Sequence, residues 1–173
     1  MPYARDYVAS ETLGNGLAVT IRALRPDDRE RVAAAVRGLD RESIYFRLFS
    51  YRTELTEAGL DRIMRFDSAR EVVLLVVTAD GNAIGSGRYV VNGAGTAEVA
   101  FIVEEDCHGL GIASRLLRHL ARVGAAQGIH TFEADVLAGN KAMLAVFART
   151  GWPMTKTHEG DTVHVTLALP EVP

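Results

Sequence analysis

The sequence predicts a single α/β domain of the α+β type, in which helices flank a mixed central sheet. Three observations predict this class. Residues 71–78 form a nearly continuous Val/Leu run, and residues 79–82 carry the Asp-Gly signal of a hairpin turn. A strand–loop–helix–strand unit follows over residues 98–137, and such a crossover requires its two strands to pair in parallel. The chain of 173 residues has the size of one domain.

The N-terminal part begins with residues 1–16, which carry little pattern. They are expected to form an extension, either ordered or frayed, before a domain over residues 17–170. Residues 17–24 alternate between apolar and polar side chains and predict the first strand. Pro26, with two acids behind it, is typical of a helix start. Three helices are expected in this part, over residues 28–38, from about residue 40, and over residues 56–66.

The rest of the chain predicts strands joined by short turns, with two further helices. An antiparallel meander is expected from residues 71–78, 83–91 and 98–103. Apolar residues then recur at helical spacing up to Gly128, and a second helix follows Asn140 up to Gly151. The remaining expectations are a strand over residues 131–137 parallel to the strand at residue 98, a loop over residues 153–161, and a last strand over residues 163–169.

Composition and charge exclude several classes of protein. Hydrophobic residues make up 48% and charged residues 24% of the chain, which is ordinary for a globular domain. No apolar run approaches the roughly 20 residues that span a bilayer, and the first residues lack the apolar core of a signal peptide. One cysteine, Cys107, excludes an internal disulfide and fits a cytoplasmic location. The net charge of −3 argues against a nucleic-acid partner and suits a cationic amine.

The junction between the strand at residue 98 and the following helix is the first candidate site. Gly109 and Gly111 remove side chains where the helix begins, so backbone N–H groups over residues 110–114 can approach a ligand closely. Free N–H groups and the positive end of the helix dipole favour an anion such as a pyrophosphate. The alternative is that the two glycines only form a tight turn, and spacing alone does not separate these interpretations.

This junction resembles the acyl-CoA-binding core of the GNAT superfamily of N-acetyltransferases, whose loop reads Gln/Arg-x-x-Gly-x-Gly/Ala. Here the loop is His108-x-x-Gly111-x-Ala113, so the glycine and the small last residue match, and His108 departs from the pattern. The resemblance extends over roughly residues 19–169. Residues 140–152 are similar to a family pattern of asparagine, aromatic, glycine and aromatic. Residues 40–47 resemble the GNAT domain of bacterial protein-lysine acetyltransferases.

The resemblance implies a GNAT-like fold in which acetyl-CoA binds where two parallel strands splay apart. The pantetheine arm would pair with strand backbone, the pyrophosphate would lie on the glycine loop, and an asparagine after the neighbouring strand would contact the coenzyme. The implied coenzyme-binding residues are Phe101, Ile102, Val103, His108, Gly109, Leu110, Gly111, Ile112, Ala113, Ser114 and Asn140. Asn140 has a second interpretation as the N-cap of the next helix, and one side chain can serve both roles.

Catalysis in this family often uses a glutamate on the central strand, and Glu98 occupies that position. Apolar neighbours along the strand would favour a base that works near neutral pH. The alternative is an exposed carboxylate at a strand end. Phe147 stands where many members carry a tyrosine that protonates the departing thiolate, and phenylalanine has no proton to give. Tyr89 and Tyr45 are candidate substitutes, and unaided departure is another, because a thiol of pKa about 8.5 is a fair leaving group.

Other chemistries are weakly supported. The sixth position of the glycine pattern is Ser114, so the loop does not match a dinucleotide fingerprint, and no ATP-type phosphate loop occurs. The histidines are scattered without ligand spacing, so no metal is expected. Cys107 and His108 are not expected to form a nucleophilic pair, because adjacent residues on a turn usually point apart. Arg115 and Arg118 either meet coenzyme phosphates or face solvent.

We therefore expect an acetyl-CoA-dependent N-acetyltransferase that acylates a primary amine, either a small molecule or a protein lysine, by direct attack in a ternary complex. Two alternatives remain open. One is a catalytically inactive coenzyme-binding sensor, which Phe147 and His108 favour, and the other is an interaction module without coenzyme. Substrate choice is expected to depend on the helices before Phe66 and on residues 153–161. The sequence does not determine the oligomeric state, and a homodimer is among the alternatives.

Overall fold

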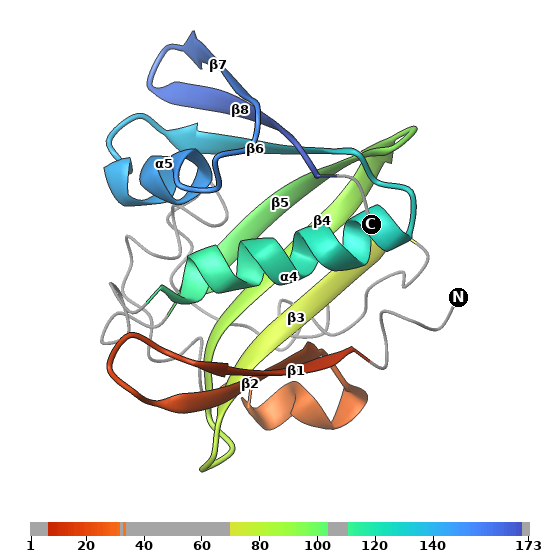
Figure 1. Ribbon diagram of the computed structural model, residues 1–173, viewed down its shortest axis with the longest axis vertical. Helices are drawn as coiled ribbons and strands as arrows, with labels where there is room; N and C mark the ends of the chain where they lie inside the picture. The colour runs from red at the N-terminus through yellow and green to blue at the C-terminus, as the bar shows by residue number, and fades with distance from the viewer. Residues whose placement is uncertain (1–6, 32, 34–69, 104–110, 171–173) are drawn as a thin grey trace.

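A computed structural model describes residues 7–31, 33, 70–103 and 111–170 of the chain (Figure 1). Its strands form one eight-stranded sheet with the order β1-β2-β3-β4-β5-β6-β8-β7. The strands are β1 Val8–Thr12, β2 Ala18–Ala23, β3 Glu71–Thr78, β4 Ala83–Gly93, β5 Thr96–Val103, β6 Thr131–Leu137, β7 Met154–Glu159 and β8 Thr162–Ala168. The described helices are the 3₁₀ turn η2 Pro26–Asp28, α4 Ile112–Ala126 and α5 Lys141–Ala148. The predicted α/β domain with a mixed sheet is confirmed.

The parallel pair of strands divides the sheet. Strands β2 to β5 pair antiparallel in chain order, as predicted for the meander. β5 and β6 pair in parallel, as the crossover through α4 requires. In the described residues their ladder has three register pairs and ends with Glu98 opposite Glu133. β5 then continues beside β4 as far as Val103 opposite Gly85, while β6 diverges from it (Figure 1). The predicted splay between the two parallel strands is therefore present.

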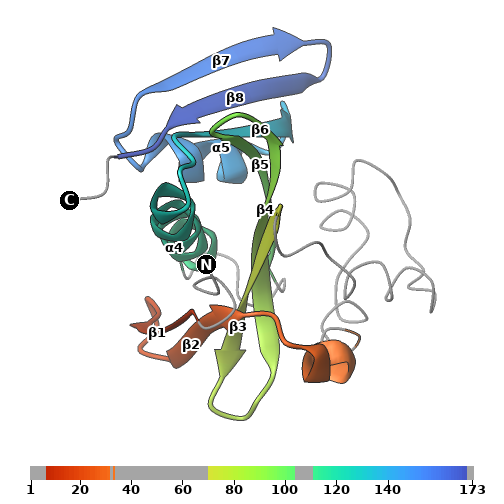
Figure 2. The ribbon, with the colours of Figure 1, turned by 90° about the vertical axis from the view of Figure 1, so that its right-hand side faces the viewer.

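The hydrophobic core lies between one face of the sheet and α4, with α5 on the same side (Figure 2). Alternate residues of each strand point to this face, which is why an apolar period of two marks these strands. Close packing makes Gly87 necessary on β4. A Cβ atom there would lie 2.9 Å from Cδ1 of Phe101 and 3.1 Å from Cδ1 of Leu120, so a larger residue would displace the core.

The N-terminal extension contains a strand that the sequence pattern did not reveal. β1 pairs antiparallel with β2, from Val8 opposite Arg22 to Thr12 opposite Ala18. None of its five positions is fully buried. Such a strand is held by backbone hydrogen bonds at the edge of the sheet, so it lacks the apolar alternation that marks a half-buried strand.

The prediction of a loop over residues 153–161 is wrong, because β7 occupies most of this segment. β7 pairs antiparallel with β8, from Met154 opposite Leu167 to Glu159 opposite Thr162, and Gly160 turns the chain with a φ of 62°. The strand reads Met-Thr-Lys-Thr-His-Glu and is exposed along most of its length. Because it is polar on both faces, it carries no periodic signal in the sequence.

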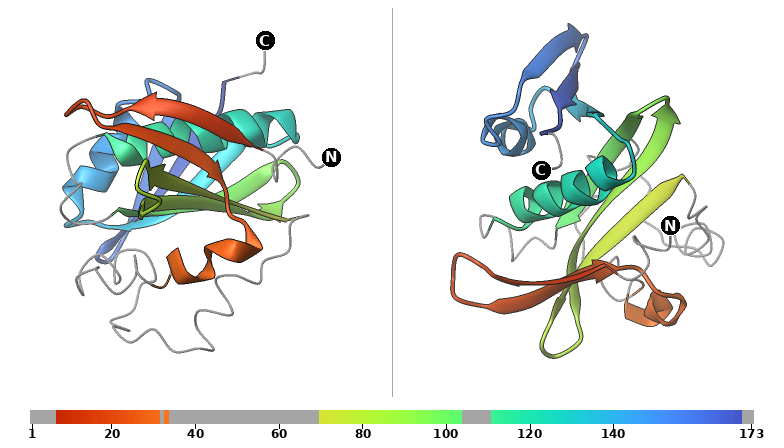
Figure 3. Two further views of the ribbon diagram at one scale, coloured as in Figure 1. Left: turned by 90° about the horizontal axis from the view of Figure 1, so that it is seen from below. Right: turned by 45° about the vertical axis from the view of Figure 1, so that its right-hand side comes forward.

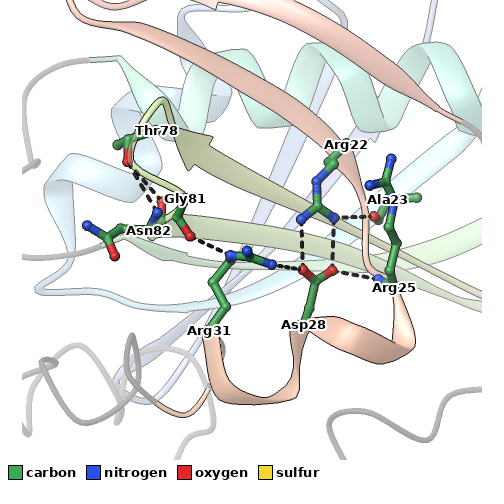
Figure 4. Close-up of polar contacts among 8 residues, drawn as sticks. All are labelled: Arg22, Ala23, Arg25, Asp28, Arg31, Thr78, Gly81 and Asn82. Atoms are coloured by element: carbon green, nitrogen blue, oxygen red, sulfur yellow. Dashed lines mark hydrogen bonds and ion pairs between the residues drawn. The ribbon is translucent and has the colours of Figure 1, made fainter.

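A buried ion-pair network fixes the chain where it leaves β2, on the side of the sheet opposite α4 (Figures 3 and 4). Asp28 is fully buried and accepts hydrogen bonds from Nη1 and Nη2 of Arg22 at 2.8 and 2.7 Å, from the Arg25 N–H at 2.7 Å and from Nη1 of Arg31 at 2.6 Å. Arg31 also donates to the carbonyl of Gly81 in the β3–β4 turn. Burial alone would raise the pKa of Asp28, but the hydrogen bonds and the arginine charge lower it to about 2.

Helical backbone follows η2 at residues 29–31 and 33, so the first predicted helix begins in the described part of the chain. The remainder of that helix, and the helices predicted from residue 40 and over residues 56–66, lie outside the described residues. Among the helices that are described, none combines the length and the apolar character of a membrane span.

Candidate functional site

The backbone of β5 continues past the end of the parallel ladder, and the predicted pantetheine-binding residues lie there. Phe101, Ile102 and Val103 pair on one side with β4, where Phe101 faces Gly87. On the other side, no described residue of β6 pairs with them. The N–H and C=O groups along this edge can therefore bond a ligand that enters between β5 and β6.

The N-terminus of α4 has the properties of an anion site. Gly111 is its N-cap, in the left-handed conformation with φ 83°, and no side chain caps the helix. The carbonyl of Gly111 accepts the N–H of Arg115 at 3.1 Å, which is the first hydrogen bond within the helix. The N–H groups of Ile112, Ala113 and Ser114 precede that bond and point out of the helix start. Together with the helix dipole they fit the pyrophosphate of a coenzyme.

Three predicted loop residues, His108, Gly109 and Leu110, lie outside the described residues. The same holds for Tyr45, one of the two tyrosines considered as a proton donor. The described half of the loop therefore starts at Gly111.

Arg115 packs against Gly111 at the start of α4. Sequence analysis had left open whether this side chain meets coenzyme phosphates or faces solvent. Its Nη1 donates to the Gly111 carbonyl at 3.1 Å, and its Nη2 donates to the Thr12 carbonyl at 3.0 Å. Its Nε lies 3.3 Å from Oε1 of Glu11. A Cβ atom at Gly111 would lie 2.3 Å from Nη1, so the guanidinium packs directly on the glycine. Arg118, by contrast, is exposed.

A chain of polar contacts continues from Glu11 into the core. Nε2 of His119 lies 2.7 Å from Oε2 of Glu11, and Nδ1 bonds the hydroxyl of Tyr7. His119 and Tyr7 are both buried, so these contacts connect β1 to α4 inside the protein. Sequence analysis did not indicate these contacts, because the two residues in each contact are more than 100 positions apart. No group of three or more His, Cys, Asp or Glu side chains within the described ranges is placed to hold a metal ion.

Glu98, the predicted base, lies at the point where β5 and β6 part. Its side chain is exposed and lies on the face of the sheet opposite α4, because the buried residues Ala97 and Val99 occupy the α4 face. The expected enclosure by apolar side chains is therefore not seen among the described residues. Its register partner on β6 is Glu133, and its partner on β4 is Val90.

A second polar cluster, which the sequence did not indicate, surrounds Glu133 on the same face. Nε2 of His164 lies 3.0 Å from Oε1 of Glu133, and Nδ1 lies 2.7 Å from Oδ1 of Asp135. Nδ2 of Asn92 donates to Oε2 of Glu133 at 3.3 Å. The hydrogen bond to Asp135 raises the pKa of His164, against a smaller opposing effect of burial. The cluster places two further carboxylates, those of Glu133 and Asp135, near the exposed Glu98, which suits a cationic substrate.

Asn140 and Phe147, two residues singled out in the sequence, lie at the start of α5 and within it. Asn140 is the N-cap of the helix, and its side-chain oxygen accepts the N–H of Met143 at 3.2 Å. The N-cap interpretation of Asn140 is thus confirmed, while its contact with the coenzyme stays a prediction. Phe147 is buried, and its ring centre lies 6.3 Å from that of Phe101 on β5.

Tyr89 is an unfavourable proton donor in this geometry. It is buried on β4, and its hydroxyl donates to Oε1 of Gln127, just after the C-terminus of α4. Burial raises its pKa. The hydroxyl is therefore bonded to Gln127 at the C-terminal end of α4, away from Gly111 at the N-terminal end, and is not placed to protonate the departing sulfur.

Comparisons with known proteins agree with this geometry. The model of the acetyltransferase (GNAT) family matches residues 39–152. Acetyltransferase PA5475 of Pseudomonas aeruginosa is 32% identical over 137 residues, which are 77% of this chain and 74% of that protein. Acetyltransferase Pat of Mycolicibacterium smegmatis is 34% identical over 134 residues, which are 76% of this chain and 40% of that longer protein.

The fold, in addition to the sequence, is similar to that of a known acetyltransferase domain. The crystal structure of the GNAT domain of S. lividans PAT superposes with a TM-score of 0.86 at 32% identity, covering 94% of this chain and 97% of that domain. The family model spans more than half of the chain, and the Pseudomonas relative is matched over most of its length. The chain therefore belongs to the GNAT family of acetyltransferases.

Proposed function

We propose that this acetyltransferase moves the acetyl group of acetyl-CoA to a primary amine, by direct attack of the amine within a ternary complex. The observation that carries the proposal is the end of the β5–β6 ladder at Glu98. It leaves strand backbone available for the coenzyme on one side and places a carboxylate at the same point.

The coenzyme site would combine three elements of the chain. The backbone of Phe101, Ile102 and Val103 offers hydrogen bonds to the amide groups of the pantetheine arm. The N–H groups of Ile112, Ala113 and Ser114 would face the pyrophosphate, and the predicted residues His108, Gly109 and Leu110 would bind the coenzyme as well. Asn140 follows β6 and would contact the coenzyme while it caps α5. Acetyl-CoA supplies the acetyl thioester, and no metal is required.

The transfer forms an amide bond from the amine nitrogen to the acetyl carbon and breaks the carbon–sulfur bond. A primary ammonium must first lose a proton, and we assign that proton to Glu98. The exposure of Glu98 lets it pass the proton on to water. Phe147 cannot protonate the departing sulfur, so the sulfur leaves as a thiolate or takes its proton from water, as its pKa of about 8.5 permits.

The acceptor is a primary amine, either a small molecule or a protein lysine. Negative charge on Glu98, Glu133 and Asp135 supports a cation on the face of the sheet opposite α4. The similarity to the GNAT domain of S. lividans PAT adds weight to an acceptor of the kind that bacterial protein-lysine acetyltransferases use.

The direct test is release of the coenzyme thiol from acetyl-CoA with a panel of small amines and lysine peptides. Turnover with at least one acceptor is expected. Tight coenzyme binding without thiol release for any acceptor would contradict the transfer and favour a sensor domain. Absence of any thermal shift with acetyl-CoA would favour an interaction module instead.

The variant Gly111→Glu tests the anion site itself. It introduces a side chain where φ is 83° and where Arg115 already occupies the space, and it adds a negative charge beside the phosphates. Coenzyme affinity should fall at least about 100-fold by calorimetry. The matched control is Gly160→Glu, which has the same left-handed strain (φ 62°) in the β7–β8 turn, with no atom within 4 Å of the new Cβ. Equal affinity of Gly111→Glu and the parent would refute the site.

A further inference from the structure

The carbonyl of Gly111 is held from two directions by one residue. It accepts the backbone N–H of Arg115 at 3.1 Å and also Nη1 of the same arginine at 3.1 Å. The peptide bond that joins Gly111 to Ile112 is trans, so its N–H points opposite to its C=O. A carbonyl fixed along the axis of α4 therefore directs the Ile112 N–H out of the helix start, where an anion binds.

Arg115 in turn is held by the N-terminal strand. Thr12 accepts from Nη2 at 3.0 Å, and the carboxylate of Glu11 lies 3.3 Å from Nε. The planar guanidinium thus contacts a carboxylate and two backbone carbonyls at once, which fixes its plane. The position allows little adjustment, because Nη1 fills the space that a Cβ at Gly111 would occupy.

Glu11 is anchored one helical turn further along α4. His119 bonds its second carboxylate oxygen at 2.7 Å, and the buried Tyr7 bonds the other side of the imidazole. Burial would raise the pKa of Glu11, but the hydrogen bond and charge of His119 and the charge of Arg115 lower it overall. Glu11 is therefore ionised at neutral pH and remains paired with Arg115.

We propose that Glu11 is a positioning residue for the coenzyme, which acts through Arg115 to fix the Gly111–Ile112 peptide with the Ile112 N–H facing the pyrophosphate. The inference rests on the proposed function, because it uses the same anion site. It makes β1, a strand outside the loop motif, part of the coenzyme site and gives Arg115 a role in orienting backbone.

A purely electrostatic role of Glu11 and a positioning role predict opposite changes in coenzyme affinity for the variant Glu11→Gln. If Glu11 acted only through its charge, its removal would relieve repulsion of the phosphates, and the coenzyme would bind as tightly as before or more tightly. If Glu11 positions Arg115, its removal loosens the Gly111 carbonyl, and the coenzyme binds more weakly. The variant Arg115→Lys makes the same distinction, because it keeps the positive charge and loses the planar fork.

The experiment measures CoA binding by calorimetry and steady-state kinetics for the parent, Glu11→Gln and Arg115→Lys. Both variants should raise the Kd for CoA and the KM for acetyl-CoA by roughly 5- to 20-fold. The value of kcat and the KM for the amine should stay within about twofold, since neither residue touches the reacting atoms. Arg122→Lys is the matched control, because Arg122 is exposed on the same helix, and this variant should bind CoA like the parent.

Unchanged or tighter CoA binding by Glu11→Gln, at an unchanged melting temperature, would overturn the inference and leave the proposed transfer intact. Should Glu11→Gln unfold, Arg115→Lys decides alone, and parent-like affinity in that variant would equally overturn the inference. A parent chain that binds no CoA would contradict both the inference and the proposed function.

Discussion

The two faces of β5, β6 and β8 carry different chemistry although they belong to the same strands. Toward α4 the side chains are buried and apolar: Ala97, Val99, Phe101, Phe132, Ala134, Val136, Val163, Val165 and Leu167. The positions between them are exposed or half-buried, and they include Glu98, Glu133, Asp135, His164 and Thr166. Because side chains alternate along a strand, one stretch of chain supplies both the core and the charged cluster. Stability should therefore depend on one face and chemistry on the other.

The strongest test of this division is Glu98→Gln on the charged face. Loss of the base should lower the rate with the true amine by about 10²- to 10⁴-fold, while the melting temperature stays unchanged because the side chain is exposed. Steady-state kinetics and thermal unfolding measure the two effects. The control is Glu159→Gln, an exposed carboxylate on β7. A rate loss below about threefold would remove Glu98 from the mechanism.

The matching test on the core face is Phe132→Ala. The ring is fully buried and lies 5.6 Å, centre to centre, from the ring of Tyr89. Its removal should lower the free energy of unfolding by about 3–5 kcal/mol, measured by urea titration. Thr166→Ala, on the other face of β8, should cost less than about 1 kcal/mol. Similar losses from the two variants would show that the faces do not differ in their contribution to stability.

The face of the sheet opposite α4 is not entirely exposed, because next to β2 it contains the buried carboxylate of Asp28, paired with Arg22. A smaller effect on stability is expected there, and it depends on pH. The pKa of Asp28 is lowered from 3.8 to about 2, so its contribution to stability is complete above pH 4 and is lost as pH falls through 2. The shift corresponds to about 2 kcal/mol. Urea titrations of the parent and Asp28→Asn between pH 2 and pH 5 should converge at the acidic end. Curves that stay parallel would contradict the assignment.

The sequence predicted the elements whose side chains alternate or repeat. The apolar run of β3, the alternation of β6 and the helical spacing of α4 each reflect burial on a defined face, so they were visible without coordinates. β1 and β7 were missed because neither has a fully buried position and both are defined by backbone hydrogen bonds, which leave no trace in composition.

The residues of the candidate site also fall into those that sequence analysis identified and those that it missed. Gly111 and Asn140 were identified because a helix start needs particular residues at particular positions. The contacts of Arg115 with Glu11 and of His119 with Tyr7 were not, because they depend on how a distant strand packs against α4. The grouping of Glu133, Asp135 and His164 likewise depends on the pairing of β6 with β8.

β7 also has a consequence for how copies of this chain behave at high concentration. It is the outermost strand of the sheet, and a free strand edge is a template on which further chains can stack into fibrils. Here the edge is a six-residue strand that bears Lys156, His158 and Glu159, all exposed. Hydrated charge and short length make that stacking unfavourable at this edge of the sheet.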